Sequence, residues 1–267
     1  MGYFAKDAFK SDICVVTGGS GALGKEIVSQ CVSLGAKVAI LDTNEKLPNE
    51  NALFIKCDVL NQQEVKNALK EIKKKLGVPT ALVNCAGGND CSATTDQEFY
   101  QEDQKGRSFF DLEIASLEKN FNLNYFGTLI PTQLFASEMV KANKGSIVNF
   151  ASVSSFNPLT KVVSYSSAKA AIVNFTKWLA IHLSKTDVRV NAVAPGFVMT
   201  EQLKFLHLDK EGNLTKRAKK VVEHTPLGRY GSSDEIVGAV LYLISDLSKF
   251  VTGSILSVDG GFSSYTI

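Results

Sequence analysis

The sequence predicts a doubly wound α/β fold, in which helices cover both faces of a seven-stranded parallel sheet. Seven short runs of apolar and β-branched residues alternate with longer stretches whose apolar residues recur near the helical period. The short runs are apolar at successive positions, which is typical of strands buried on both faces. Helical connections between successive strands make those strands parallel. Together these observations indicate a Rossmann-type fold.

The predicted elements follow one another along the whole chain. Strands are expected at 13–17, 37–42, 52–57, 81–85, 145–152, 188–195 and 254–260, and helices at 24–35, 61–77, 113–141, 162–184 and 232–246. Two segments fit no element well, the polar 87–111 and the charged, partly helical 199–227. Each follows the carboxyl end of a strand, where ligands bind in open sheets, so both are expected to line a substrate pocket. The alternative is that they are ordinary surface loops.

Composition favours a single domain over residues 1–267. A chain of this length with 45% hydrophobic residues can bury one large core. The net charge of +2 offers no field for nucleic acid, and no apolar run is long enough for a membrane span. Five cysteines without CxxC spacing and an N-terminus without a secretion signal indicate a cytoplasmic protein. The histidines are too widely spaced to predict a metal site.

A glycine-rich loop follows the first predicted strand. The stretch VVTGGSGALGKEIV contains Gly19, Gly21 and Gly24 in GxGxxG spacing and opens the first predicted helix. Glycines let the backbone approach a pyrophosphate, whose charge is met by free N–H groups and the dipole at the helix N-terminus. The spacing alone is a weak signal, because glycine-rich turns often only connect two elements.

Asp42 ends the second predicted strand, eighteen residues after Gly24. A carboxylate at this place can accept hydrogen bonds from the adenosine ribose hydroxyls. It would repel a 2′-phosphate, and no Arg or Lys stands immediately after it. The expected cofactor is therefore NAD rather than NADP.

Tyr165 and Lys169 lie four residues apart in the stretch YSSAK, inside a predicted helix. Residues at this spacing are neighbours on a helix, so the ammonium can approach the phenol. A cation at about 4 Å with an effective dielectric of about 20 favours phenolate by about 4 kcal/mol, which would bring the pKa of Tyr165 down toward neutrality. The phenol could then act as a general acid and base. Taken alone, such a pair usually has no catalytic role.

Six motifs in order resemble the short-chain dehydrogenase/reductase family over essentially the whole chain. They are the TGxxx[AG]xG loop at Thr17, Gly18, Ala22 and Gly24; NCAG at Asn84 to Gly87; an Asn-Leu pair at Asn122; Ser-x12-Tyr-x3-Lys at Ser152, Tyr165 and Lys169; PGxxxT at Pro195, Gly196 and Thr200; and SVDGGF near the C-terminus.

The resemblance implies an NAD-dependent oxidoreductase with a defined set of site residues. Ser152 would bind the substrate oxygen and Tyr165 would transfer the proton. Lys169 would lower the pKa of Tyr165 and bind the nicotinamide ribose, and Asn122 would hold a water beside it. Other residues implied to bind NAD are Thr17, Gly18, Gly19, Gly21, Ala22, Leu23, Gly24, Asp42, Asp58, Val59, Asn84, Ala86, Gly87, Pro195, Gly196, Val198 and Thr200.

Within the family, AGGN followed by ATT, together with GNLTKRAKK and HTPLGR, is similar to the branch of D-mannonate oxidoreductases, also called fructuronate reductases. A sugar acid needs hydrogen-bonding side chains and a cation. The available residues are Asn89, Lys105, Arg107, Lys216 and Arg217. Two alternatives stay open: the same fold acting on a polyol, gluconate-type, steroid or acyl substrate, and a dinucleotide-binding regulator without turnover.

The predicted helices at 113–141 and 162–184 carry more apolar surface than one core face needs. Members of the family are commonly tetramers built through these helices. A homotetramer is therefore expected.

Overall fold

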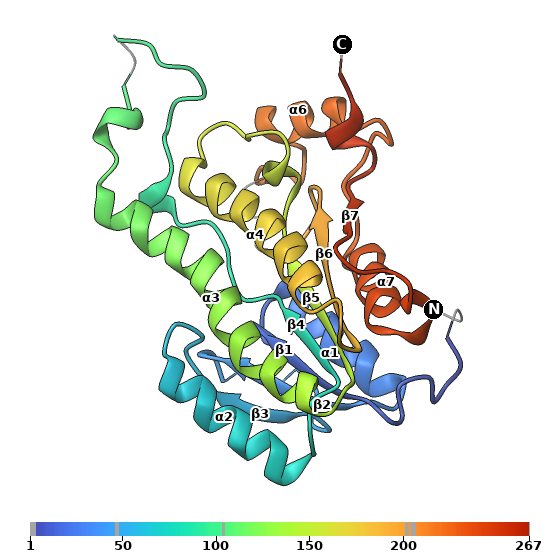
Figure 1. The fold of residues 1–267 in the computed structure, drawn as a ribbon. Helices are drawn as coiled ribbons and strands as arrows, with labels where there is room; N and C mark the ends of the chain where they lie inside the picture. Colours follow the sequence, from blue (N-terminus) through green and yellow to red (C-terminus); the bar gives the residue numbers. More distant parts are fainter. Residues whose placement is uncertain (1–3, 46–47, 103–104, 201–202, 204–206, 267) are drawn as a thin grey trace.

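A parallel sheet of seven strands runs through the centre of the molecule in the order β3-β2-β1-β4-β5-β6-β7 (Figure 1). The computed structural model describes residues 4–266 apart from 46–47, 103–104, 201–202 and 204–206. The strands are β1 (Ile13–Thr17), β2 (Lys37–Asp42), β3 (Leu53–Lys56), β4 (Ala81–Asn84), β5 (Gly145–Phe150), β6 (Val188–Pro195) and β7 (Ile255–Val258). The chain winds outward from β1 in one direction and from β4 in the other, so the strand order reverses between these two neighbours. The predicted fold is confirmed.

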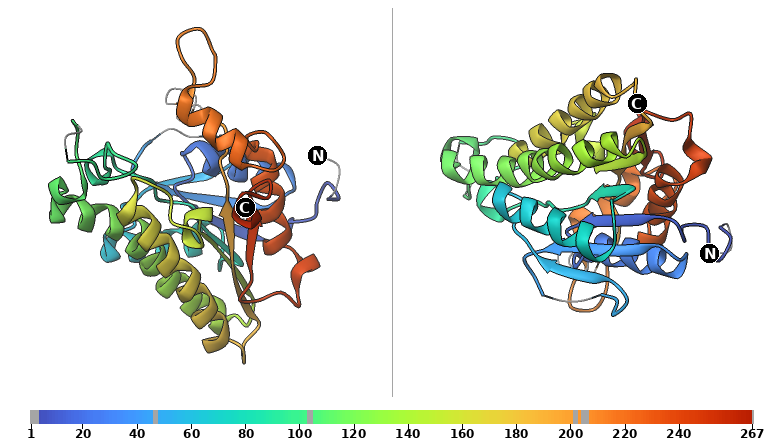
Figure 2. Two further views of the ribbon diagram at one scale, coloured as in Figure 1. Left: turned by 90° about the horizontal axis from the view of Figure 1, so that it is seen from above. Right: turned by 60° about the horizontal axis from the view of Figure 1, so that its bottom comes forward.

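Helices form a layer on each face of the sheet (Figure 2, right). On one face lie α1 (Ala22–Ser33) and α7 (Ser233–Ile244), and on the other α2 (Gln62–Lys75), α3 (Ile114–Lys141) and α4 (Val163–His182). A further helix, α6 (Lys216–His224), lies beyond the carboxyl ends of the strands (Figure 1). Short 3-10 turns are η1 (Cys91–Ala93), η2 (Phe109–Asp111), η3 (Val153–Ser155), η4 (Asp246–Ser248) and η5 (Phe262–Ser264).

Alternating strand residues enter apolar cores on opposite faces of the sheet. In β1, Val16 packs into the core beneath α1 and α7, whereas Val15 packs into the core beneath α2, α3 and α4. The same alternation occurs in β2, where Ile40 and Leu41 face opposite layers. Since both faces of each strand are covered, the sequence shows continuous apolar runs instead of an alternating pattern.

The fifth strand ends two residues earlier than the 145–152 expected from sequence. Ser152 adopts an extended conformation, and its Oγ accepts a hydrogen bond from the Ser154 backbone N–H at 3.2 Å, which caps η3. The chain therefore turns away from the sheet at Ser152, and this turn places the hydroxyl at the sheet edge.

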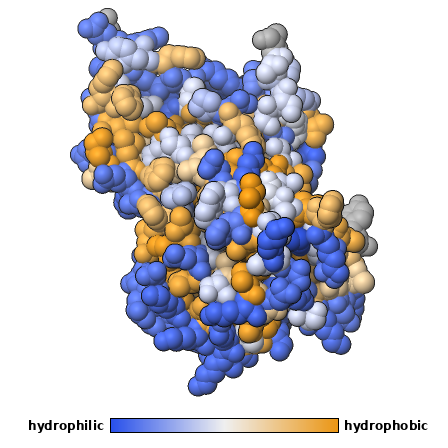
Figure 3. Space-filling model, viewed as in Figure 1, coloured by the Kyte–Doolittle hydropathy of each residue, from blue (hydrophilic) through white to orange (hydrophobic). Residues whose placement is uncertain are grey.

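The segment between β4 and α3 projects away from the sheet (Figure 1). Phe99, Tyr100, Phe109 and Phe110 on it are exposed. Apolar surface is visible on this projection in Figure 3. Parts of the two expected substrate segments, 103–104, 201–202 and 204–206, lie outside the described residues. Within the described part of the chain, no helix is both long and apolar enough to cross a membrane.

Candidate active site

A cleft of about 870 Å³ opens at the carboxyl ends of the strands. Its wall combines the loop after β1, the ends of β2, β4, β5 and β6, the start of α4, and Arg217 of α6. The left view of Figure 2 looks onto this edge of the sheet. The cleft spans the switch point between β1 and β4, where open sheets bind ligands.

The loop after β1 packs so closely that it requires glycine. Gly18 has φ +65°, in the left-handed region, and a Cβ on Gly24 would stand 2.1 Å from the carbonyl oxygen of Gly18. The helix α1 that follows has no side-chain cap at Gly21 and no acidic residue in its first turn. Its first N–H groups therefore remain available to an anion, unlike those of α2, where the Asn61 side chain accepts two N–H groups.

The Asp42 carboxylate lies at the end of β2, in the wall of the cleft. One oxygen accepts a hydrogen bond from the Ser20 N–H at 3.0 Å and the other accepts one from the Asn44 N–H at 2.9 Å. These bonds hold the carboxylate beside the glycine loop. Asp58 and Val59 line the same end of the cleft.

Ser152, Tyr165 and Lys169 meet on the opposite part of the wall. The phenol of Tyr165 forms a hydrogen bond with the Ser152 side chain. Lys169 is 4% exposed, and its ammonium donates to the Phe150 carbonyl at 2.7 Å while lying 5.6 Å from the centroid of the Tyr165 ring. The three side chains thus come from the end of β5 and one face of α4.

The expected lowering of the Tyr165 pKa by Lys169 is wrong for this structure. Burial raises the pKa of Tyr165, the hydrogen bond with Ser152 opposes that rise, and the Lys169 charge is not among the causes. Burial also lowers the pKa of Lys169 to about 8. The Coulomb argument from spacing neglected desolvation, which disfavours the charged form of both groups. The phenol is accordingly protonated at neutral pH.

Most residues expected at the cofactor site line the cleft. They are Gly18, Gly21, Ala22, Leu23, Gly24, Asp42, Asp58, Val59, Ala86, Gly87, Tyr165, Lys169, Pro195, Gly196, Val198 and Thr200. Thr17, Gly19 and Asn84 lie behind the wall. The Thr17 hydroxyl accepts from the Ala86 N–H at 3.2 Å, and the Asn84 amide donates to Thr132 at 2.8 Å. These residues shape the wall instead of forming its surface.

Asn122 does not reach the site, which corrects the sequence prediction. Its side chain is exposed, whereas Asn124 is fully buried. The Asn124 amide donates to the Gly88 carbonyl at 2.8 Å, and its oxygen accepts from the Gly88 N–H at 3.1 Å. Two positions along a helix amount to a rotation of about 200°. The motif was therefore matched two residues out of phase, and Asn124 is the asparagine beside the cleft.

Replacing each of the two asparagines by alanine should have different effects on stability and turnover. Asn124→Ala should lower the free energy of unfolding by about 2–3 kcal/mol, because it removes the hydrogen bonds that the buried Asn124 side chain makes with the Gly88 backbone and the Asn120 carbonyl, and it should reduce turnover. Asn122→Ala should change stability by less than about 0.5 kcal/mol, as surface substitutions usually do. Urea denaturation and steady-state kinetics measure both. Equal effects of the two substitutions would contradict the assignment.

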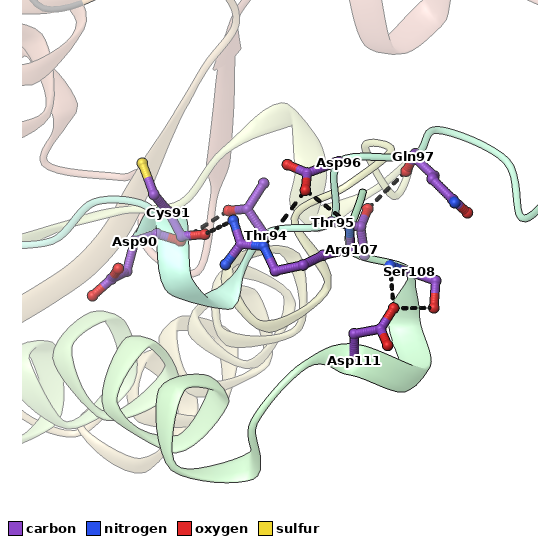
Figure 4. Close-up of polar contacts among 9 residues, drawn as sticks. All are labelled: Asp90, Cys91, Thr94, Thr95, Asp96, Gln97, Arg107, Ser108 and Asp111. Atoms are coloured by element: carbon purple, nitrogen blue, oxygen red, sulfur yellow. Dashed lines mark hydrogen bonds and ion pairs between the residues drawn. The ribbon is translucent and has the colours of Figure 1, made fainter. Parts of the chain in front are cut away.

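Of the polar residues proposed for substrate, Asn89, Arg107 and Arg217 line the cleft, and the exposed Lys105 and Lys216 do not. Figure 4 shows how Arg107 is fixed: its guanidinium donates to the Cys91 carbonyl at 3.0 Å, and its backbone N–H donates to the Asp96 carboxylate at 2.8 Å. These contacts hold Arg107 against Cys91 and Asp96 at the rim of the cleft.

Lys161 and His207 also line the cleft, and sequence reasoning did not place either of them there. Lys161 lies in the loop just before α4, separated from its first residue by Val162, and has φ +77°. His207 is 4% exposed and shares a hydrogen bond of 2.5 Å with the Tyr230 hydroxyl. Lys161 lies only four residues before Tyr165, but no periodicity marks it.

Comparison with known proteins agrees with this geometry. A family model described as enoyl-(acyl carrier protein) reductase matches residues 19–263. An uncharacterized oxidoreductase of Haemophilus influenzae is 42% identical over 279 residues, which cover 100% of this chain and 98% of that protein. The uncharacterized oxidoreductase UxuB of Bacillus subtilis is 39% identical over 263 residues, covering 94% of this chain and 95% of that one.

A solved structure extends the likeness to three dimensions. A Haemophilus influenzae protein provisionally assigned as a D-mannonate oxidoreductase, crystallised with bound NAD, has a TM-score of 0.92 and 42% sequence identity, over 96% of both chains. The matches span nearly the whole chain, including its glycine loop and the Ser152, Tyr165 and Lys169 constellation. The protein is an oxidoreductase of the short-chain dehydrogenase/reductase family.

Proposed function

We propose that the enzyme uses NAD to interconvert a secondary alcohol and a ketone on a sugar acid, such as D-mannonate and D-fructuronate. The observation that carries the proposal is one continuous cleft, with the glycine loop and Asp42 at one end and Ser152, Tyr165 and Lys169 at the other. The residues 1–267 act as one catalytic domain, with 87–111 and 199–227 on the substrate side.

The residues present fit NAD. The uncapped N-terminus of α1 and the absent Cβ of Gly24 leave space and donors for a pyrophosphate. The two carboxylate oxygens of Asp42 lie at the end of the cleft where the adenosine would bind. The bound NAD of the Haemophilus relative supports the same cofactor here. When bound, the nicotinamide supplies hydride transfer.

The protein handles the proton. The Ser152 oxygen accepts from the Ser154 N–H, and its hydroxyl, which bonds to the Tyr165 phenol in this structure, donates to a substrate oxygen when one binds beside the two residues. Tyr165 gives its phenolic proton to a carbonyl oxygen during reduction and takes one during oxidation. Lys169, which is buried on α4 four residues after Tyr165, binds the nicotinamide ribose. Asn124 takes the place expected of Asn122 and fixes the Gly88 backbone at the base of the site.

A substrate panel tests the proposal. Purified enzyme with NAD is assayed for NADH formation at about 340 nm with D-mannonate, other hexonates, hexuronates, neutral polyols, a hydroxysteroid and a hydroxyacyl thioester. We expect a hexonate to give the highest kcat/KM. Highest turnover with a steroid or acyl substrate would refute the sugar-acid proposal while retaining the oxidoreductase.

Asp42 should set the preference for NAD over NADP. Asp42→Asn keeps one acceptor oxygen, enough for the Ser20 or the Asn44 N–H but not for both, and removes the charge that repels a 2′-phosphate. The ratio of kcat/KM for NAD to that for NADP should fall about tenfold, which corresponds to about 1.4 kcal/mol. Glu45→Gln, at an exposed carboxylate outside the cleft, is the control. An unchanged ratio in Asp42→Asn would count against the role of the carboxylate.

We also propose a cytoplasmic homotetramer that acts in carbohydrate metabolism. Phe126 on α3, and Trp178 and Ile181 on α4, expose large apolar side chains, which supports association through these helices. The free cysteines agree with a reducing compartment.

A further inference from the structure

The substrate end of the cleft carries an excess of positive charge. Arg107, Lys161 and Arg217 line it, and Lys220 stands beside Arg217 on α6. The facing carboxylates are those of Asp96 and Glu98. Among the described residues that line this end of the cleft, three cations thus stand against the one carboxylate of Asp96, and Glu98 and Lys220 pair beside it. Asp42 and Asp58 lie at the opposite, adenosine end, so the cleft is polarised along its length.

Two of the lining cations already have partners. The Arg107 Nε lies 3.6 Å from the Asp96 carboxylate, and the guanidinium also donates to the Cys91 carbonyl. Arg217 Nη1 lies 3.7 Å from the Glu98 carboxylate, which Lys220 binds more closely, at 2.8 Å. Lys161 lies near enough to both carboxylates for its charge to lower their pKa values. Its ammonium nonetheless makes no ion pair or hydrogen bond with the described residues.

The backbone conformation of Lys161 is unfavourable for a residue other than glycine. A φ of +77° lies in the left-handed region, which disfavours any residue that carries a Cβ. The Thr95 N–H donates to the Lys161 carbonyl at 3.1 Å, and this bond ties Lys161 to the substrate segment. Strained residues that persist in a cleft point to a use for the side chain held there.

We propose that Lys161 binds the carboxylate of the substrate, and this inference rests on the proposed sugar-acid function. Lys161 lines the same cleft as Ser152 and Tyr165, from the loop that leads directly into α4. A carboxylate there would gain a charge-assisted hydrogen bond without displacing an existing ion pair. Arg217, whose bond to Glu98 is long, is placed to support the same anion.

The test compares Lys161→Met, Lys161→Arg and Lys161→Gly with wild type, using NAD and the hexonate that gives the highest turnover in the panel. Lys161→Met should raise the KM for the hexonate about 10- to 100-fold, as expected for loss of a hydrogen bond to a charged group. The KM for NAD should stay within about twofold, since Lys161 lies at the other end of the cleft. Lys161→Arg should recover part of the loss. Lys216→Met, next to Arg217 but exposed and outside the cleft, should leave both constants unchanged.

Lys161→Gly separates binding from folding. Glycine adopts φ +77° freely, so this variant should melt at or above the wild-type temperature and yet show the raised KM of Lys161→Met. A hexonate KM within twofold of wild type in both variants overturns the role of Lys161. If wild type oxidises no sugar acid at all, the proposed function itself fails, and the inference fails with it.

Discussion

Replacing Tyr165 by phenylalanine should reduce kcat by about 10³-fold, the middle of the range that general acid-base catalysis contributes. The substitution removes only the hydroxyl that bonds to Ser152, on a helix face otherwise unchanged. Without that group a substrate oxygen has no proton donor during reduction and no acceptor during oxidation. Steady-state kinetics in both directions measure the loss.

The binding of NADH shows whether the loss is chemical. Tyr165→Phe keeps the aromatic ring and with it the shape of the wall, so the dissociation constant for NADH, followed by its fluorescence, should change by less than about threefold. Tyr125→Phe is the matched control, because Tyr125 packs among Phe121, Phe126 and Phe175 outside the cleft. Substantial turnover in Tyr165→Phe with normal NADH binding would refute the acid-base role.

The pH profile of the wild-type enzyme follows from the same residue. Because burial raises the pKa of Tyr165, the phenol form persists at neutral and mildly alkaline pH. Reduction, which uses the phenol, should therefore hold its rate there, whereas oxidation, which uses the phenolate, should accelerate as the pH rises. Both profiles should flatten in Tyr165→Phe.

The fold could be predicted from sequence because local and global signals agree. Runs such as the one through Val15 and Val16 are apolar at every position, and each of these residues has a different core to enter. The exact ends of helices and strands were harder to predict from the sequence than their order. The end of β5 depends on the Ser152 side chain capping the next turn, a contact that no hydrophobic pattern marks.

The site was predictable where a residue type and its spacing are both restrictive. Only glycine fits at position 24, because the Gly18 backbone leaves no room for a Cβ there. Ser152, Tyr165 and Lys169 line the same part of the cleft. The prediction of Asn122 was wrong because Asn122 and Asn124 point to different sides of α3, and the motif alone does not show which of the two lies beside the cleft. The predicted lowering of the Tyr165 pKa was wrong because desolvation depends on how the surrounding chain buries the phenol, and the sequence does not show this.

Lys161 shows a different limit of sequence reasoning. Helix and strand periodicity carry no information about a residue with φ +77° in a connecting loop. The closeness of this loop to Thr95 is a tertiary contact between segments 66 residues apart. Lysines are also so common on surfaces that one unpaired ammonium cannot be selected without coordinates.

Gly24→Ala should be the most damaging small substitution at the cofactor end. The added Cβ would stand 2.1 Å from the Gly18 carbonyl oxygen and 2.8 Å from the Gly19 Cα, both backbone atoms that cannot rotate away. Loop and helix must separate, which should lower the free energy of unfolding by about 3 kcal/mol. The same shift moves the α1 N-terminus, so the affinity for NADH should fall at least about tenfold. Urea denaturation and NADH titration measure the two effects.

Gly238→Ala provides the control that separates crowding from the general effect of adding a methyl group. Gly238 lies within α7, and a Cβ there meets no atom within 4 Å. Alanine should therefore stabilise the protein by up to about 1 kcal/mol through helix propensity and leave NADH binding unchanged. If Gly24→Ala matched Gly238→Ala in both measurements, the loop would have room for a side chain. The close approach of α1 to the turn after β1 would then not be what prepares this helix end for a pyrophosphate.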